Sequence, residues 1–185
     1  MNGKSGSHGD FEQLALPLVD SLYNFARWLT RDETEAQDVV QEAFAKALRG
    51  FATFTPGTDF RAWMFRILRN VFLTSRSGLQ AKLTVELGPD EEESAAVTWE
   101  TPESLALASA TRSALEAALE RLPPRYREVI LLCDVEEMKY REIAEVLSVP
   151  VGTVMSRLAR GRKLLREMLT ERQVTVSSPR KEGGQ

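Results

Sequence analysis

Four polar side chains near the C-terminus have the types and the spacing of a surface that reads DNA. The apolar residues of this segment recur at intervals of three, four and seven, which predicts a helix with one buried stripe: Val151, Val154, Leu158 and Leu165. The opposite face then carries Ser156, Arg157, Arg160 and Lys163. Hydroxyl and guanidinium groups hydrogen-bond to base edges and phosphates. A solvated basic helix is the plainer alternative, but the one-sided charge favours DNA binding.

A tight turn separates this helix from another helix upstream. Ser148-Val-Pro150 cannot continue a helix, because the proline ring restricts the preceding residue and lacks an N–H donor. Upstream of the turn, Ile143, Ala144 and Leu147 form another apolar stripe. The two segments predict a helix-turn-helix, whose second helix enters the major groove.

A second segment, residues 60–76, interleaves aromatic rings with cations. The rings are Phe60, Trp63, Phe65 and Phe72, and the cations are Arg61, Arg66, Arg69 and Arg76. Aromatic rings stack on unpaired bases, while cations hold the phosphates of a single strand. The rings also suit a helical core, and we assign Phe60 and Trp63 to packing against the preceding helices rather than to base contact.

Enzymatic chemistry has little support in this sequence. His8 is the only histidine and Cys133 the only cysteine, so a Ser-His-Asp or Cys-His arrangement, a disulfide and a multi-cysteine zinc site are not expected. Cys133 follows Val129-Ile-Leu-Leu132 and is predicted to be a small buried residue. We expect no metal, no cofactor and no catalytic activity. Because no apolar run is long enough to span a bilayer, a cytoplasmic protein without membrane insertion is expected.

The charge of the chain is unevenly distributed, although its net value is only −3. Residues 60–82 contain five basic residues and no acid, residues 86–103 contain seven acids and no base, and bases predominate again after Pro150. Two basic surfaces separated by an acidic segment suit a protein that contacts nucleic acid at two places.

Helical periodicity and turn signals predict an all-α fold of two small helical domains on a flexible acidic linker. A capping box at Asp10 opens the first helix, Pro17 kinks or restarts it, Asp32 or Thr34 caps the second helix, and Asp59 caps the third, which runs to about Ser75. Pro124 begins a later helix that ends near Asp134. The expected divisions are a disordered tail (1–9), a first domain (10–77), the linker (78–103), a second domain (104–172) and a polar tail (173–185).

Two segments together resemble a known family. Asp38-Val-Val-Gln-Glu-Ala-Phe44 and the string FRAWMFRILRN at residues 60–70 resemble the second conserved region of bacterial sigma factors. The string LPPRYREVILL at residues 122–132, with the helix-turn-helix through Lys163, resembles the fourth. A chain with only these two regions resembles an extracytoplasmic-function (ECF) sigma factor of the sigma-70 family. The resemblance covers roughly residues 10–77 and 104–170.

The resemblance implies binding to core RNA polymerase (its β′ clamp and β flap), recognition of the −35 and −10 elements of promoter DNA, strand opening, and restraint by an anti-sigma factor. The polymerase-binding face would contain Asp38, Gln41, Glu42 and Glu35. The −10 contacts would come from Phe54, Thr55, Asp59, Arg61, Arg66, Arg69 and Asn70. The −35 contacts would come from Met155, Ser156, Arg157, Arg160, Arg162, Lys163 and Arg141.

Some implications of the resemblance stay open. Relatives often carry Arg or Lys where Met155 stands, so the −35 preference is not fixed. The acidic linker is either a plain tether or a segment that threads through polymerase toward its active site. We expect the free protein to bind duplex DNA poorly. The alternative function is a conventional helix-turn-helix regulator, which has no need of the aromatic and basic segment at residues 60–76.

Overall fold

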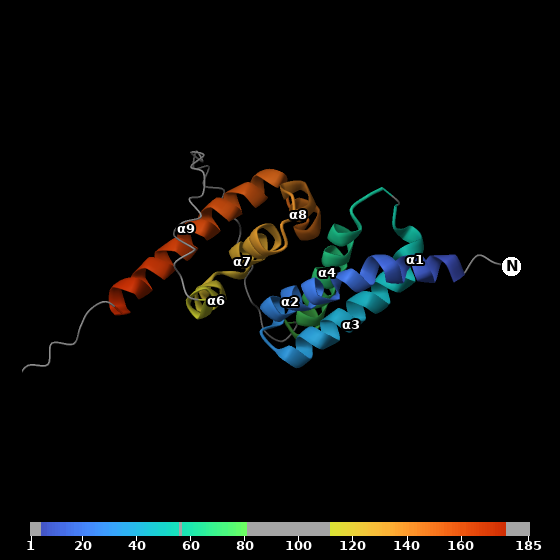
Figure 1. Cartoon of the computed structure of the whole chain (residues 1–185), viewed down its shortest axis with the longest axis horizontal. Coiled ribbons are helices and arrows are strands. Elements are labelled where there is room, and N and C mark those ends of the chain that lie inside the picture. Colours follow the sequence, from blue (N-terminus) through green and yellow to red (C-terminus); the bar gives the residue numbers. More distant parts are fainter. Residues whose placement is uncertain (1–4, 56, 81–111, 177–185) are drawn as a thin grey trace, which may run out of the picture.

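The computed structural model describes residues 5–55, 57–80 and 112–176, which are helical with short turns and contain no strand. Figure 1 shows them as two groups of helices. The N-terminal domain contains α1 (Ser5–Ala15), a 3-10 turn (Leu16–Leu18), α2 (Val19–Thr30), α3 (Glu33–Gly50), a second 3-10 turn (Phe51–Thr53) and α4 (Phe60–Gln80). The C-terminal domain contains α6 (Arg112–Arg121), α7 (Pro124–Ile130), a π-helical turn (Leu131–Val135), α8 (Tyr140–Leu147) and α9 (Val151–Val176). The predicted all-α class is confirmed.

The start of the N-terminal domain differs from the prediction. Helix α1 begins at Ser5, so Asp10 lies inside a helix and the capping box expected there is wrong. No proline interrupts residues 5–9, and the buried Phe11 anchors the helix that continues backward from it. The break at Pro17 is confirmed, since the 3-10 turn separates α1 from α2. Most of the predicted linker lies outside the described residues, while α4 continues to Gln80 and α9 to Val176.

The predicted caps at the next two helices are confirmed. An Asp32 carboxylate oxygen accepts a hydrogen bond from the Glu35 backbone N–H at 2.8 Å, and Asp59 accepts one from the Ala62 N–H at 2.9 Å. Pro124 is the first residue of α7, a position whose N–H has no acceptor within the helix, so the missing proline N–H costs no hydrogen bond.

We expect Asp32→Ala to lower the free energy of unfolding by about 1 kcal/mol, because an N–H at the start of α3 loses its acceptor. Chemical denaturation of the full chain measures the change. Asp38→Ala is the matched control, since Asp38 is exposed on the same helix and caps nothing. Equal stability of the two variants would contradict the capping role.

The N-terminal core lies where α2, α3 and α4 pack against one another. Its fully buried side chains include Leu22, Phe25, Met64, Phe65 and Leu68. At the other end of α4, five rings make edge-on, tilted and stacked contacts: Phe11, Phe51, Phe54, Phe60 and Trp63. This cluster fixes the loop between α3 and α4.

In the C-terminal domain, α9 packs on α7 and α8. Val154, Leu158 and Leu165 are buried as predicted, but Val151 is 37% exposed, because it is the first residue of α9 and lies beyond the packed stripe. Gly161 marks a close approach: a Cβ there would lie 3.0 Å from Ile130 Cδ1 and 3.2 Å from Tyr126 Cβ. The helices α7 and α9 can lie this close only because residue 161 has no side chain.

Candidate nucleic-acid and polymerase surfaces

The helix-turn-helix presents a mixed polar surface on the first half of α9. Arg160 and Lys163 are exposed, while Met155, Ser156 and Arg157 are half-buried. The Ser156 hydroxyl donates to the Thr153 carbonyl at 3.1 Å. It can therefore act only as a hydrogen-bond acceptor toward a ligand. Arg141 is exposed in the first turn of α8.

The turn between α8 and α9 depends on Ser148, which adopts the left-handed conformation with φ of 56°. Its backbone N–H still bonds to the Ala144 carbonyl, and the Val149 N–H bonds to the same carbonyl at 3.1 Å. This C-cap closes α8 and reverses the chain in three residues, so that α9 can start at Val151.

Arg162 lies apart from the rest of the predicted −35 set. Its Nε donates to Asp134 Oδ2 at 3.1 Å, and its Nη2 lies 3.5 Å from Cys133 Sγ. The hydrogen bond to Asp134 raises the pKa of Arg162 further above its ordinary value. Burial, followed by the Asp134 charge, raises the pKa of the Cys133 thiol. Arg162 therefore ties α9 to the π-helical turn, a structural role that its basic surroundings in the sequence did not reveal.

The loop before α4 and the first turns of that helix form a pocket of about 190 Å³. Four residues of the predicted −10 set line it together: Phe54, Thr55, Asp59 and Arg66. Asp59 also caps α4, so one of its carboxylate oxygens is already engaged. The loop turns at Gly57, whose φ of +92° favours glycine.

Trp63, which is predicted to pack against the preceding helices, is also a pocket residue. Its ring packs at 5.3 Å from Phe54 and 5.5 Å from Phe60, yet it also lines the pocket. A signal was present in the spacing: Trp63, Arg66 and Asn70 follow one another at three and four residues and so share one face of α4. Asn70 is exposed on that face, one turn beyond the pocket.

Arg61 and Arg69, also in the predicted −10 set, lie at the contact between the two domains. Arg61 forms an ion pair with Glu136, and Arg69 Nε donates to Glu128 Oε2 at 2.9 Å. The pocket itself is lined by one side chain from the C-terminal domain, Glu145 of α8. No local sequence pattern links residues 59 or 75 positions apart in this way.

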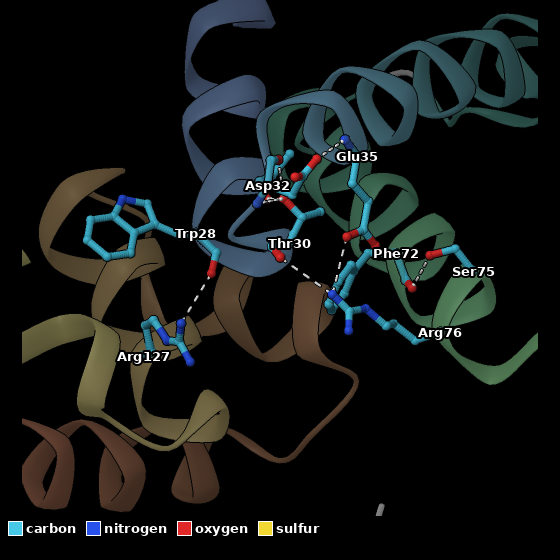
Figure 2. Close-up of polar contacts among 9 residues, drawn as sticks. Trp28, Thr30, Asp32, Glu35, Phe72, Ser75, Arg76 and Arg127 are labelled. Atoms are coloured by element: carbon cyan, nitrogen blue, oxygen red, sulfur yellow. Dashed lines mark hydrogen bonds and ion pairs between the residues drawn. The ribbon is translucent and has the colours of Figure 1, made fainter. Parts of the chain in front are cut away.

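The predicted polymerase-binding face divides in two. Asp38, Gln41 and Glu42 are exposed on α3. Glu35 is only 34% exposed in its side chain and forms an ion pair with Arg76 at 3.3 Å, as Figure 2 shows. Arg76 also donates to the Thr30 carbonyl at 3.4 Å, so that Glu35 helps to join α4 to the end of α2.

Within the described residues, no three His, Cys, Asp or Glu side chains gather as a metal site would require. None of the helices described is both long and apolar enough to cross a lipid bilayer.

Comparisons with known proteins match both domains. Sigma-70 region 2 matches residues 14–81, and sigma-70 region 4 matches residues 112–165. The ECF RNA polymerase sigma factor SigE of Mycolicibacterium smegmatis is 33% identical, over 91% of this chain and 65% of its own length. SigW, an ECF RNA polymerase sigma factor of Bacillus subtilis, is 28% identical, over 91% of this chain and 93% of its own.

Two solved structures resemble both domains at once. The sigma factor RpoE from Bartonella quintana, solved in complex with the anti-sigma factor NepR, superposes with a TM-score of 0.68 at 28% identity, covering 87% of this chain and 97% of that one. CnrH, solved in complex with the cytosolic domain of CnrY, superposes with a TM-score of 0.62 at 28% identity, covering 94% and 93%.

Proposed function

Because this chain belongs to the ECF sigma factors of the sigma-70 family and is thus a promoter-recognition factor for transcription initiation, we propose that it binds two elements of a promoter while bound to core RNA polymerase. The N-terminal domain takes the −10 element and the C-terminal domain the −35 element. Polymerase carries out the catalysis, and this chain supplies recognition and strand opening.

The pocket at the start of α4 carries the −10 part of the proposal. It brings aromatic rings, threonine hydroxyls and the Arg66 guanidinium to one hollow next to an exposed helix face. A base that has left the duplex stacks on the ring of Phe54 or Trp63, while Arg66 faces the phosphate backbone. The Asn70 amide both donates and accepts, so it is suited to a base edge.

The −35 contact is assigned to the exposed part of α9. Arg160 and Lys163 lie on the face that enters the major groove, with Ser156 and Arg157 beside them. Met155 offers no hydrogen-bond donor, so the preference at its base pair depends on apolar contact. Arg141 lies at the start of α8, from where it reaches a phosphate. Arg162 is a weaker candidate because Asp134 engages it.

The exposed carboxylates of α3 are assigned to polymerase. Asp38, Gln41 and Glu42 form one exposed face, and Glu42 lies 3.7 Å from Lys46 and 3.4 Å from Arg49. These contacts are solvent-exposed and cost little to exchange for a basic partner surface. Glu35 contributes to this face only indirectly, by holding Arg76.

A regulatory protein partner of the anti-sigma kind is the other expected ligand. The similar sigma factor RpoE was solved with the anti-sigma factor NepR. By analogy, such a partner would cover the α3 face around Asp38–Phe44 and the helix-turn-helix of this chain, and so block both polymerase and DNA.

Run-off transcription with purified core polymerase tests the function. We expect the protein to direct initiation from a promoter selected by sequencing transcripts induced on overexpression. Arg160→Ala should reduce this initiation about tenfold or more, since one good base contact contributes about 1–3 kcal/mol. Arg112→Ala, an exposed change on α6, is the matched control. Duplex binding without any specific initiation would favour a conventional regulator instead.

A further inference from the structure

The two domains contact each other through charged groups that the proposed DNA surface also needs. Arg61 Nη1 donates to the Glu136 carbonyl at 2.6 Å and pairs with the Glu136 carboxylate. Arg69 pairs with Glu128 at 2.9 Å. Glu136 is 6% exposed and Glu128 7%, so both acids of the C-terminal domain are buried against α4.

Two further arginines cross between the domains in opposite directions. Arg31 Nη2 donates to the Glu120 carbonyl at the end of α6 at 2.6 Å. Arg127 Nη1 donates to the Trp28 carbonyl at the end of α2 at 3.3 Å, as drawn in Figure 2. The last carbonyls of a helix have no partner within it, so each arginine satisfies an acceptor that the other domain leaves open. Burial, and then the charge of Arg31, lowers the pKa of Arg127.

A third acid reaches the −10 pocket. Glu145 of α8 lines it together with Trp63 and Arg66. Glu145 thus brings an acidic residue of the C-terminal domain to the pocket that contains Arg66, the cation that we assign to a DNA phosphate. Helix α8 packs along α4, and the buried apolar residues of both domains form one continuous cluster.

We propose that this arrangement is a closed, self-masked state, in which Glu128 and Glu136 of the C-terminal domain take the places of DNA phosphates on the −10 surface. The proposal rests on the proposed −10 function and on the place that the resemblance gives to Arg61 and Arg69 in the −10 contact. While Glu128 and Glu136 lie buried against α4, the C-terminal domain occupies the space through which a DNA strand would reach Arg61 and Arg69. Opening of the domain contact must therefore precede engagement of the −10 strand by Arg61 and Arg69.

The chemistry of the contact suits a state that opens and closes. Burying an ion pair removes two charges from water, and this desolvation cost offsets much of the attraction between them. Separation of the domains returns Glu128 and Glu136 to water, and the DNA strand then supplies new anions to the arginines. An interface of this kind separates more readily than one held by apolar burial alone.

Distances between spin labels in the full chain test the closed state. The labels are attached at Asp20→Cys and Glu167→Cys, two exposed sites in different domains, on a Cys133→Ser background. We expect one narrow distance distribution, which becomes broader and longer in the double variant Glu128→Gln, Glu136→Gln. The control Glu12→Gln, Glu33→Gln makes the same charge change at two exposed sites of the N-terminal domain and should leave the distribution unchanged. An unchanged distribution in the first double variant would overturn the proposal.

A charge-exchange experiment distinguishes loss of the specific contact from misfolding as the cause of a broader distance distribution. Glu128→Arg alone should widen the distribution through repulsion from Arg69. Adding Arg69→Glu restores the pair with the charges exchanged and should narrow the distribution again. Failure of this rescue, with the helical circular dichroism intact, would count against a specific contact.

Masking is measured with a fluorescein-labelled single-stranded oligodeoxynucleotide of mixed sequence at low salt. The double variant Glu128→Gln, Glu136→Gln should bind it about tenfold more tightly than the charge-matched control does. A chain that opens without this gain would overturn the masking, and with it the assignment of Arg61 and Arg69 to the −10 strand. A closed chain that still directs transcription normally would instead leave the proposed function intact and refute only the need for opening.

Discussion

Valine in place of Gly161 is expected to lower the free energy of unfolding of the C-terminal domain by roughly 3 kcal/mol, the upper range for overpacking a core. Even one added carbon would lie 3.0 Å from Ile130 Cδ1 and 3.2 Å from Tyr126 Cβ. Ile130 Cδ1 can rotate away, but Tyr126 Cβ is fixed to the backbone of α7. Because a small domain has only a few kcal/mol of stability, the −35 contact should fail as well. Thermal and urea unfolding measure the loss.

The same helix provides the control for this prediction. Gly152 has no neighbouring atom within 4 Å of an added Cβ. Gly152→Ala should therefore be neutral or stabilising, by up to about 1 kcal/mol from helix propensity. Gly161→Ala should lie between the two variants, since the same propensity gain opposes its crowding. A fully stable Gly161→Val protein would show that α7 and α9 do not approach as closely as described.

Strand opening is the function expected to suffer most from a change at two residues. Arg66→Ala combined with Asn70→Ala removes the cation and the amide from the outer face of α4. We expect at least a tenfold loss of opening, because a hydrogen bond to a charged group such as a phosphate is typically worth about 1.5–3 kcal/mol. Both side chains are exposed, so stability should change little. Permanganate reactivity of unpaired thymines at the −10 element reports the opening directly.

A template with a preformed −10 bubble separates opening from polymerase binding. If the two residues act in opening and in holding the strand, the bubble should restore most of the lost transcription. Asp38→Ala combined with Glu42→Ala changes the proposed polymerase face instead, and the bubble should not rescue that variant. Equal rescue of both would contradict the separate roles given to α3 and α4.

Local signals explain why much of the fold could be predicted from the sequence. Asp32, Asp59 and Pro124 act within three residues of their own position, and the structure confirms all three. The cap predicted at Asp10 was wrong, because a capping pattern does not prevent a helix from beginning earlier when no proline precedes it. The predicted burial of Val151 was wrong, because periodicity places a residue on one face of a helix but does not show where the packed part of that face ends.

Contacts at the candidate site could be predicted only in part, because some of them join residues far apart in the sequence. The resemblance groups Phe54, Thr55, Asp59 and Arg66 as −10 candidates, and these four residues line one pocket. The partners of Arg61, Arg69 and Arg162 could not be found, because their acids lie 28 to 75 residues away along the chain. Charge type alone does not distinguish an arginine that awaits a phosphate from one that already holds a carboxylate.

The buried contact of Arg61 and Arg69 with the C-terminal domain also bears on how selective the chain can be in the cell. Apparent affinity equals intrinsic affinity multiplied by the fraction of molecules that are competent to bind. With about one molecule in a hundred open, stray single-stranded DNA would be bound about a hundredfold more weakly than the exposed surface alone allows. A ligand that prefers the open form recovers this factor for every later ligand. Core polymerase, if it prefers the separated domains, would thereby act as the allosteric effector of promoter recognition.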